Sequence, residues 1–249
     1  MSDGVYDYPA GQPLGFPRCR ACPYVVNGPV RVCAACAAET LTPVAADHCP
    51  VCSQDISRTG NCSNKLCNDP ERAIDSISAI AMFTEPLDEL IRGYKENPAL
   101  TRGLIFGRLV LGWLHKNVRP EDVDLIVANP TFSESEQLGH TEMVLAHARR
   151  EDLFVNYPID DPDHPTLIKT AATAKSRNSS LANKRAVADA LGEVLTLAGA
   201  ADVVDGRRVI IYDDVCTSGS QLNAVARFLK DRGATSVRGL VLARAPWRS

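Results

Sequence analysis

The sequence predicts an α/β protein: a parallel sheet with helices on both faces, preceded by a small cysteine-rich module. Three observations support this fold class. Eight of the nine cysteines lie between Cys19 and Cys67, strand-like and helix-like segments alternate in the rest of the chain, and 45% hydrophobic with 23% charged residues is typical of globular proteins. We expect a flexible N-terminus at 1–18, a double zinc-binding module at 19–70 and the α/β domain at 71–249.

The clustered cysteines form pairs whose members have two or four residues between them. The pairs are Cys19/Cys22, Cys33/Cys36, Cys49/Cys52 and Cys62/Cys67. Four such pairs supply two tetrahedral zinc sites of four thiolates each, and such closed shells make both zinc ions structural. A disulfide framework, the alternative, would need an oxidising compartment, and no export signal is present in the sequence. The module is poor in large apolar side chains, so the metals are expected to supply its folding energy and to give it a core of its own.

Two ways of joining these pairs stay open. Adjacent pairing gives Cys19/Cys22/Cys33/Cys36 and Cys49/Cys52/Cys62/Cys67, whereas crossed pairing gives Cys19/Cys22/Cys49/Cys52 and Cys33/Cys36/Cys62/Cys67. Ten residues separate Cys22 from Cys33 and nine separate Cys52 from Cys62, which suits a short hairpin within each site. Adjacent pairing is therefore favoured, and His48 is expected to lie outside the ligand shell.

Strand and helix patterns alternate after Pro70. Strands are expected at 74–83, 123–128, 209–212 and 237–243, and helices at 86–94, 99–117, 139–150, 186–198 and 220–232. A polar connection at 156–165 and a stretch rich in Lys, Ser and Asn at 169–184 interrupt the alternation. This order of elements implies a parallel sheet with helices on both faces.

Charge is divided unevenly along the chain, although the formal net charge is only −3. Residues 73–165 carry 8 basic and 16 acidic side chains, whereas residues 166–249 carry 13 basic and 7 acidic ones. A basic C-terminal third indicates an anionic ligand, either phosphate groups or nucleic acid, with solvated helix faces as the alternative. The most apolar stretch, 104–114, is too short to span a bilayer and contains Arg108, so we expect a cytoplasmic protein without membrane insertion.

The most informative segment is 208–220, which reads RVIIYDDVCTSGS. A buried strand delivers Asp213 and Asp214 at its carboxyl end, where open α/β sheets bind ligands, and a loop of small residues then begins a helix. Backbone amides at a helix N-terminus favour a phosphate, and Gly219 allows the backbone to approach it. The two acids repel phosphate, so vicinal ribose hydroxyls or Mg²⁺ would meet them instead. The segment thus predicts a ribose 5-phosphate site, with an ordinary strand-turn-helix as the alternative; its phosphate-binding residues are Thr217, Ser218, Gly219 and Ser220.

This segment resembles the signature of type I phosphoribosyltransferases. The resemblance implies that Asp213 and Asp214 hold the ribose hydroxyls of phosphoribosyl pyrophosphate and that the 217–220 loop holds its 5-phosphate. Cysteine pairs, the segment FTEPLDELIRGYK at 83–95 and this signature occur in the same order in the ComF family, amidophosphoribosyltransferase-like proteins linked to bacterial DNA uptake. The chain is similar to that family from Cys19 onward, which implies a type I phosphoribosyltransferase-like sheet for 71–249.

One stretch departs from the pattern of that family. Its members commonly carry Arg-Gly-Phe-Asn-Gln after the middle strand, where type I enzymes place a pyrophosphate-contacting loop, whereas this chain has QLGHTE at 137–142. Gly139 is kept, but the arginine and the amides are lost. Basic residues of a flexible loop are expected to compensate by closing on the diphosphate: Lys169, Lys175, Arg177, Lys184 and Arg185. For each of these alone, a solvent-facing charge is the alternative. Cys216, outside the cysteine cluster, is expected to be a small apolar residue.

The resemblance implies an enzyme with two structural zinc ions and with Mg²⁺ bound alongside its substrate. A nitrogen nucleophile would displace magnesium-bound pyrophosphate from the anomeric carbon of phosphoribosyl pyrophosphate, with Asp213 and Asp214 as the catalytic residues that anchor the ribose. Two other functions stay open. One is a catalytically inactive accessory protein whose partners are nucleic acid or DNA-uptake proteins; the other is a sensor of phosphoribosyl pyrophosphate. A homo-oligomer is left open as well.

Overall fold

The structure, a computed structural model, describes residues 34–97, 100–132, 138–173, 190–200 and 202–246. Its central feature is a sheet of four parallel strands in the order β1-β6-β5-β2. These strands are β1 (Ser76–Met82), β6 (Ser236–Arg244), β5 (Arg208–Cys216) and β2 (Leu125–Ala128). β5 and β6 lie in the middle and are buried along nearly their whole length, as expected for parallel strands covered on both faces.

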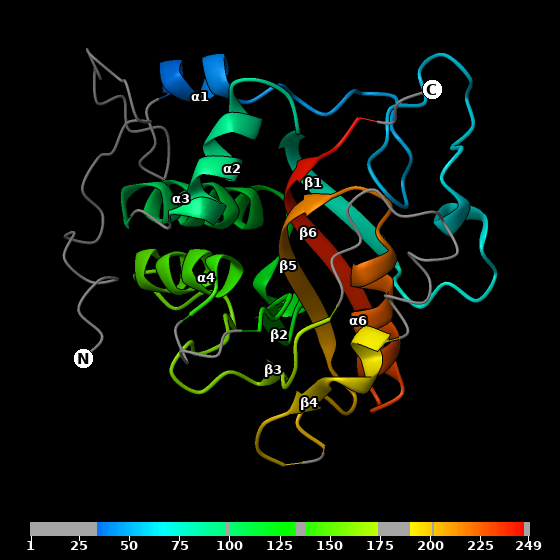
Figure 1. The fold of residues 1–249 in the computed structure, drawn as a ribbon, viewed down its shortest axis with the longest axis vertical. Coiled ribbons are helices and arrows are strands. Elements are labelled where there is room, and N and C mark those ends of the chain that lie inside the picture. Colours follow the sequence, from blue (N-terminus) through cyan, green and yellow to red (C-terminus); the bar gives the residue numbers. More distant parts are fainter. Residues whose placement is uncertain (1–33, 98–99, 133–137, 174–189, 201, 247–249) are drawn as a thin grey trace.

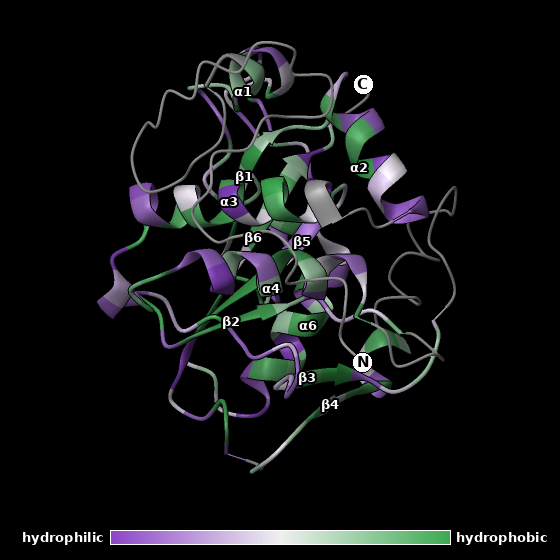
Figure 2. Cartoon of the chain, turned by 90° about the vertical axis from the view of Figure 1, so that its left-hand side faces the viewer, coloured by the Kyte–Doolittle hydropathy of each residue, from purple (hydrophilic) through white to green (hydrophobic). Residues whose placement is uncertain are grey.

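Helices cover both faces of this sheet, which confirms the predicted fold class (Figure 1). One face carries α2 (Leu87–Glu96), α3 (Leu100–Asn117) and α4 (His140–Glu151), and the other carries α6 (Ser220–Lys230). Alternate side chains of β5 serve the two faces: Ile210 and Tyr212 join the first apolar cluster, and Val209 and Ile211 join the second. In Figure 2, β2 is hydrophobic behind α4, which presents hydrophilic stretches outward.

Three short helical segments lie outside the sheet and its covering helices. They are α1 (Ala34–Thr40), the 3-10 helix η1 (Lys65–Asn68) and the 3-10 helix η2 (Pro120–Asp122). Among the described residues, every helix is too short or too polar to cross a bilayer.

Two sequence-based boundaries are corrected by the structure. The helix expected at 186–198 is wrong in its second half: residues 190–193 are helical, but β4 (Leu195–Leu197) pairs antiparallel with β3 (Leu167–Lys169). The apolar spacing there fits either element, and burial of Leu167 and Leu195 in the second cluster selects the strand. The strand expected at 209–212 continues to Cys216, because β6 accompanies it that far. Residues 186–189 lie outside the described part.

The cysteine-rich segment packs along the edge of the sheet. The amide of Ile77 in β1 donates to the carbonyl of Val51 at 2.6 Å, and the Ser53 hydroxyl donates to the carbonyl of Ile77 at 2.9 Å. Leu66 packs against the second apolar cluster, and Cys36 belongs to the first. The expectation of separate cores is therefore wrong, because apolar side chains on both sides of residue 70 share the same clusters.

Candidate functional site

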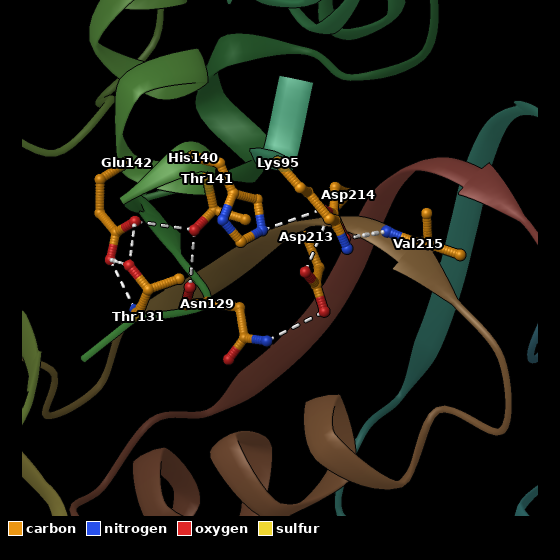
Figure 3. A network of polar contacts seen from close by, with 9 residues as sticks. All are labelled: Lys95, Asn129, Thr131, His140, Thr141, Glu142, Asp213, Asp214 and Val215. Carbon is orange, nitrogen blue, oxygen red and sulfur yellow. Dashed lines mark hydrogen bonds and ion pairs between the residues drawn. The ribbon is translucent and has the colours of Figure 1, made fainter. Parts of the chain in front are cut away.

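Two adjacent acids near the carboxyl end of β5 form the centre of the site. Asp213 and Asp214 are 8% and 7% exposed, so both carboxyl groups are largely removed from water. Successive side chains of a strand point to opposite faces, and the two acids accordingly have different partners. Figure 3 shows them between the end of β2, the start of α4 and the end of α2.

Asp214 is the more strongly stabilised of the two carboxylates. Its Oδ1 accepts from the amide of Val215 at 2.6 Å, and its Oδ2 forms ion pairs with Lys95 Nζ at 2.6 Å and His140 Nε2 at 2.9 Å (Figure 3). Burial alone would raise the pKa of Asp214, but the imidazole of His140 and the ammonium of Lys95 outweigh burial and lower it to about 2. Asp214 is therefore ionised at neutral pH.

Asp213 has neutral partners instead. Its Oδ2 accepts from the Asn129 side-chain amide at 2.9 Å, and its Oδ1 accepts from the amide of Asp214 at 2.8 Å. Burial and the adjacent charge of Asp214 raise the pKa of Asp213 to about 7. At neutral pH this carboxyl group stands near its titration midpoint, so a cation or a hydrogen-bond donor would draw it into the ionised form.

A hydrogen-bond network fixes the start of α4, from which His140 reaches Asp214. Glu142 accepts from the Thr131 amide at 2.6 Å and from the Thr141 hydroxyl at 2.8 Å, and the same hydroxyl lies 2.9 Å from the Asn129 carbonyl (Figure 3). A Cβ on Gly139 would overlap Thr131 Oγ1 and crowd Glu142, so this close approach requires glycine. The network joins α4 to the end of β2 and thereby holds His140 in position.

The loop after β5 presents backbone amides at the start of α6. Thr217, Ser218 and Gly219 have amide nitrogens for which no described residue is an acceptor. The hydroxyls of Ser218 and Ser220 lie 2.9 Å apart, and Thr217 is exposed. Such amides, together with nearby hydroxyls at a helix N-terminus, can donate hydrogen bonds to a bound anion.

The structure gives a further reason for glycine at position 219. Its φ of +82° lies in the left-handed region, and a Cβ would approach Ile77 Cδ1 and Leu66 Cδ2 to 2.8 Å. Glycine is thus required by the backbone conformation and by packing against the protein, and its predicted place beside a phosphate stays a prediction.

Four of the predicted zinc ligands form a compact group. The Sγ atoms of Cys49, Cys52, Cys62 and Cys67 all lie within 4.8 Å of one another. Three of the separations are 3.6–3.7 Å, close to the edge of about 3.8 Å for a tetrahedron with metal–sulfur bonds of about 2.3 Å. Hydrogen bonding to Cys67 lowers the pKa of Cys52 to about 4, whereas burial raises that of Cys62 to about 11. The sulfur donors therefore fit a structural zinc ion, which would hold all four as thiolates.

This grouping is the adjacent pairing for the second half of the module and contradicts the crossed one. Of the other predicted ligands, Cys19, Cys22 and Cys33 lie outside the described residues, and Cys36 is buried. His48 donates to or accepts from no cysteine among the described residues; its Nδ1 lies 2.7 Å from the Ala45 carbonyl. A second zinc site stays a prediction.

The basic residues expected around the diphosphate are only partly described. Lys169 ends β3, and its Nζ donates to the Thr173 hydroxyl at 2.7 Å, while burial lowers the pKa of the ammonium. The other four lie outside the described residues: Lys175, Arg177, Lys184 and Arg185. The predicted apolar character of Cys216 agrees with its burial at the end of β5.

Sequence reasoning missed three side chains of the site. Lys95 closes the quoted segment 83–95, and His140 lies in the departing stretch 137–142, yet neither was assigned to the acids. Asn129, directly after the strand expected at 123–128, was not assigned to the site either. A polar residue directly after a buried strand was the available signal for Asn129, since parallel strands end at the same edge.

Comparisons with known proteins point to the same part of the chain. Residues 166–248, about a third of the sequence, match the phosphoribosyl transferase domain family. Ribose-phosphate pyrophosphokinase of Maricaulis maris (strain MCS10) is 32% identical over 109 residues, which are 43% of this chain and 34% of that protein. The Bordetella pertussis protein of the same name is 36% identical over 86 residues, 34% of this chain and 27% of its own. The chain thus spans about a third of the length of these curated relatives.

Similarity to solved structures is more distant. A hypoxanthine phosphoribosyltransferase from Staphylococcus aureus is 13% identical, with 57% of this chain and 62% of that chain covered and a TM-score of 0.34. The part of the chain that matches the phosphoribosyl transferase domain family contains β5, both acids and the loop before α6.

Proposed function

We propose that the chain binds phosphoribosyl pyrophosphate together with Mg²⁺ and transfers the phosphoribosyl group to a nitrogen nucleophile. The observation that carries this proposal is the placement of Asp213 and Asp214 at the carboxyl end of a central strand, beside the amides of 217–219, which have no acceptor among the described residues. The names of the matched family and of the curated relatives both refer to a phosphorylated ribose, which supports the same ligand.

Each group of the site has a role in this reaction. The amides and hydroxyls of the 217–220 loop would bind the 5-phosphate, and Asp213 would accept from the ribose hydroxyls. The bond between the anomeric carbon and pyrophosphate breaks, pyrophosphate leaves with the electron pair, a carbon–nitrogen bond forms, and the nitrogen loses a proton. Bound Mg²⁺ would neutralise charge on the leaving group. Asp213 and Asp214 would stabilise the positive charge that develops on the sugar.

The two nitrogen side chains beside Asp214 offer a replacement for the arginine that the 137–142 stretch lacks. Lys95 and His140 both lie within 3 Å of Asp214 Oδ2 and are partly exposed, with 29% and 25% of their side chains accessible. In this position they would donate hydrogen bonds to the diphosphate. Their elements, α2 and α4, belong to the described structure and need no closing loop.

Calorimetric titration with phosphoribosyl pyrophosphate, with and without Mg²⁺, tests binding directly. We expect the parent chain to bind and Asp213→Asn to lose at least about tenfold in affinity, because an ionised acceptor is removed. Asp231→Asn, at the exposed end of α6, is the matched control and should bind like the parent. Release of pyrophosphate in the presence of amines and nucleobases then tests transfer. A parent that binds neither phosphoribosyl pyrophosphate nor ribose 5-phosphate would overturn the proposal.

A sensor of phosphoribosyl pyrophosphate is the second candidate. The observation in its favour is that Asp214 already contacts the Lys95 ammonium and the His140 imidazole, which leaves less negative charge to stabilise a transition state. Tight binding without release of pyrophosphate by any acceptor would select the sensor over the enzyme.

A role in DNA uptake rests on the resemblance to the ComF family and on the basic C-terminal third. An accessory protein for nucleic acid would bind single- or double-stranded DNA with an affinity that falls steeply as salt is raised. Fluorescence anisotropy with labelled oligonucleotides over a salt series tests this role, and DNA transformation of a host strain lacking the chain tests its place in uptake.

A further inference from the structure

Arg244, the last residue of β6, joins the four-cysteine cluster to the loop after β5. Its side chain is fully buried, and its Nε donates to the Cys52 carbonyl at 2.8 Å. Nη1 donates to the Cys216 carbonyl at 2.8 Å and also to the Thr217 carbonyl, while Nη2 lies 3.8 Å from Cys52 Sγ. One guanidinium thus holds both a ligand residue of the cluster and the carbonyls of Cys216 and Thr217, where β5 leads into the loop.

Asn64 makes a second connection between the same two parts. It lies between the cluster residues Cys62 and Cys67 and is 2% exposed. Its Nδ2 donates to the Ser218 carbonyl at 3.1 Å, and its Oδ1 accepts from the Leu66 amide at 3.1 Å. Leu66 in turn occupies the space that a Cβ on Gly219 would need. The turn that carries two of the four sulfur ligands therefore packs directly on the loop.

These contacts determine which way the loop amides point. In a trans peptide the carbonyl of one residue and the N–H of the next point in opposite directions. Arg244 and Asn64 hold the carbonyls of Cys216, Thr217 and Ser218, so the N–H groups that follow them point away from the cluster. These are the amides of 217–219, the same three that have no acceptor among the described residues.

We propose that a metal ion at the four-cysteine cluster and a phosphate at the 217–220 loop stabilise each other, with Arg244 and Asn64 as the positioning residues that couple them. The proposal rests on the proposed function in taking this loop as the phosphate site. A bound metal fixes the turns that carry Cys52 and Asn64, and these turns preset the loop for an anion. Loss of the metal removes that support, so phosphate affinity falls; by linkage, bound phosphate slows the loss of metal.

The coupling is first tested without any ligand, through the rate at which a coloured chelator removes zinc from the full chain. Gly219→Ala changes only the loop and adds a methyl group towards Leu66, so zinc should leave at least about fivefold faster. Gly206→Ala is the matched control, since Gly206 has a similar φ of +69° but no atom within 4 Å of its Cβ position. Equal rates for the two variants, or a chain that carries no zinc, would overturn the proposal.

Ribose 5-phosphate then tests the linkage in the other direction. It should slow zinc release from the parent and from Asn61→Ala, an exposed control in the same cysteine-rich segment, but not from Asn64→Ala. A response of Asn64→Ala equal to that of the parent would overturn the role of Asn64. If calorimetry finds no binding of ribose 5-phosphate or phosphoribosyl pyrophosphate to the parent, the proposed function fails, and the Gly219 and Gly206 comparison still decides whether loop and cluster are coupled.

Discussion

Lys95 Nζ lies 2.6 Å from Asp214 Oδ2, so the end of α2 supplies the counter-charge for an acid near the carboxyl end of a central strand. The two residues are far apart in sequence and meet because α2 and α4 cover the face of the sheet to which Asp214 points. His140 Nε2 lies 2.9 Å from the same oxygen. Asp214 therefore has two side-chain partners from the protein before any ligand binds. Asp213 forms no ion pair with any described residue, so it is the acid whose negative charge is left for a ligand to neutralise.

The two acids should therefore contribute to stability with opposite signs. Asp214→Asn leaves Lys95 and His140 without their anion in a poorly hydrated place, and we expect the free energy of unfolding to fall by about 1–3 kcal/mol, below the range for fully buried pairs because Lys95 is partly exposed. Asp213→Asn should be neutral or stabilising. Urea unfolding of both variants measures the difference, with Asp231→Asn as the exposed control. Equal losses for the two variants would contradict this assignment.

Stability should also depend on pH in a way that Asp213 explains. Its pKa is raised to about 7 in the folded chain, whereas an unfolded aspartate titrates near pH 4. Between these values the folded state retains a proton that the unfolded state has lost, so the free energy of unfolding falls as pH rises, by up to about 1.4 kcal/mol per pH unit. Asp213→Asn should lack this contribution.

Urea unfolding at several pH values between 4.5 and 7.5 measures that contribution as the difference between Asp213→Asn and the parent. The stability advantage of the variant should grow with pH across the window. A constant difference would mean that the carboxyl group ionises in the folded chain as easily as in the unfolded one.

The sheet and its covering helices could be predicted because each element carries its own periodic pattern. The stretch 190–198 is where prediction from periodicity fails. Its apolar residues Leu191, Val194, Leu195 and Ala198 have helical spacing. In the structure, however, Leu195 lies in a strand that pairs with β3. Such a choice depends on a segment elsewhere in the fold. The local sequence pattern of 190–198 therefore does not distinguish a helix from a strand.

The candidate site, like the fold, was predicted from the sequence only in part. Asp213, Asp214 and the 217–220 loop are contiguous, so one segment of sequence predicted their proximity, although their roles in binding are still predictions. Lys95, His140 and Arg244 come from three other elements, and only the strand order β1-β6-β5-β2 and the helices on its faces bring them to β5. The shared core of the cysteine-rich segment was missed for the same reason, since Leu66 and Cys36 find their apolar contacts in the sheet domain.

Metal content gives a direct test of the cysteine cluster. We predict two zinc ions per chain from the eight cysteines, and Cys49→Ser should lower this to about one, because Cys52, Cys62 and Cys67 keep only three thiolates. Since the segment shares its core with the sheet, the variant should lose more than about 3 kcal/mol of global stability instead of unfolding locally. Elemental analysis and urea unfolding followed by two probes measure both effects. Ser63→Ala, an exposed change in the same turn, should alter neither, and full zinc content in Cys49→Ser would refute the ligand assignment.

His140 offers a way to separate recognition of the diphosphate from recognition of the 5-phosphate. If His140 and Lys95 interact with the diphosphate, His140→Ala should weaken binding of phosphoribosyl pyrophosphate by about tenfold, the value of one charge-assisted hydrogen bond. Ribose 5-phosphate has no diphosphate, so its affinity should change much less. Calorimetry with both ligands in the presence of Mg²⁺ measures this contrast.

The matched control is His164→Ala, which removes an exposed imidazole from the polar connection before β3 and should leave both affinities unchanged. Equal weakening of both ligands by His140→Ala would show that the imidazole acts through Asp214 and the ribose instead of through the diphosphate. In that case the arginine missing from 137–142 would have no substitute among the described residues of α2 and α4. The pyrophosphate-binding role would then fall to the basic residues between Lys169 and Arg185.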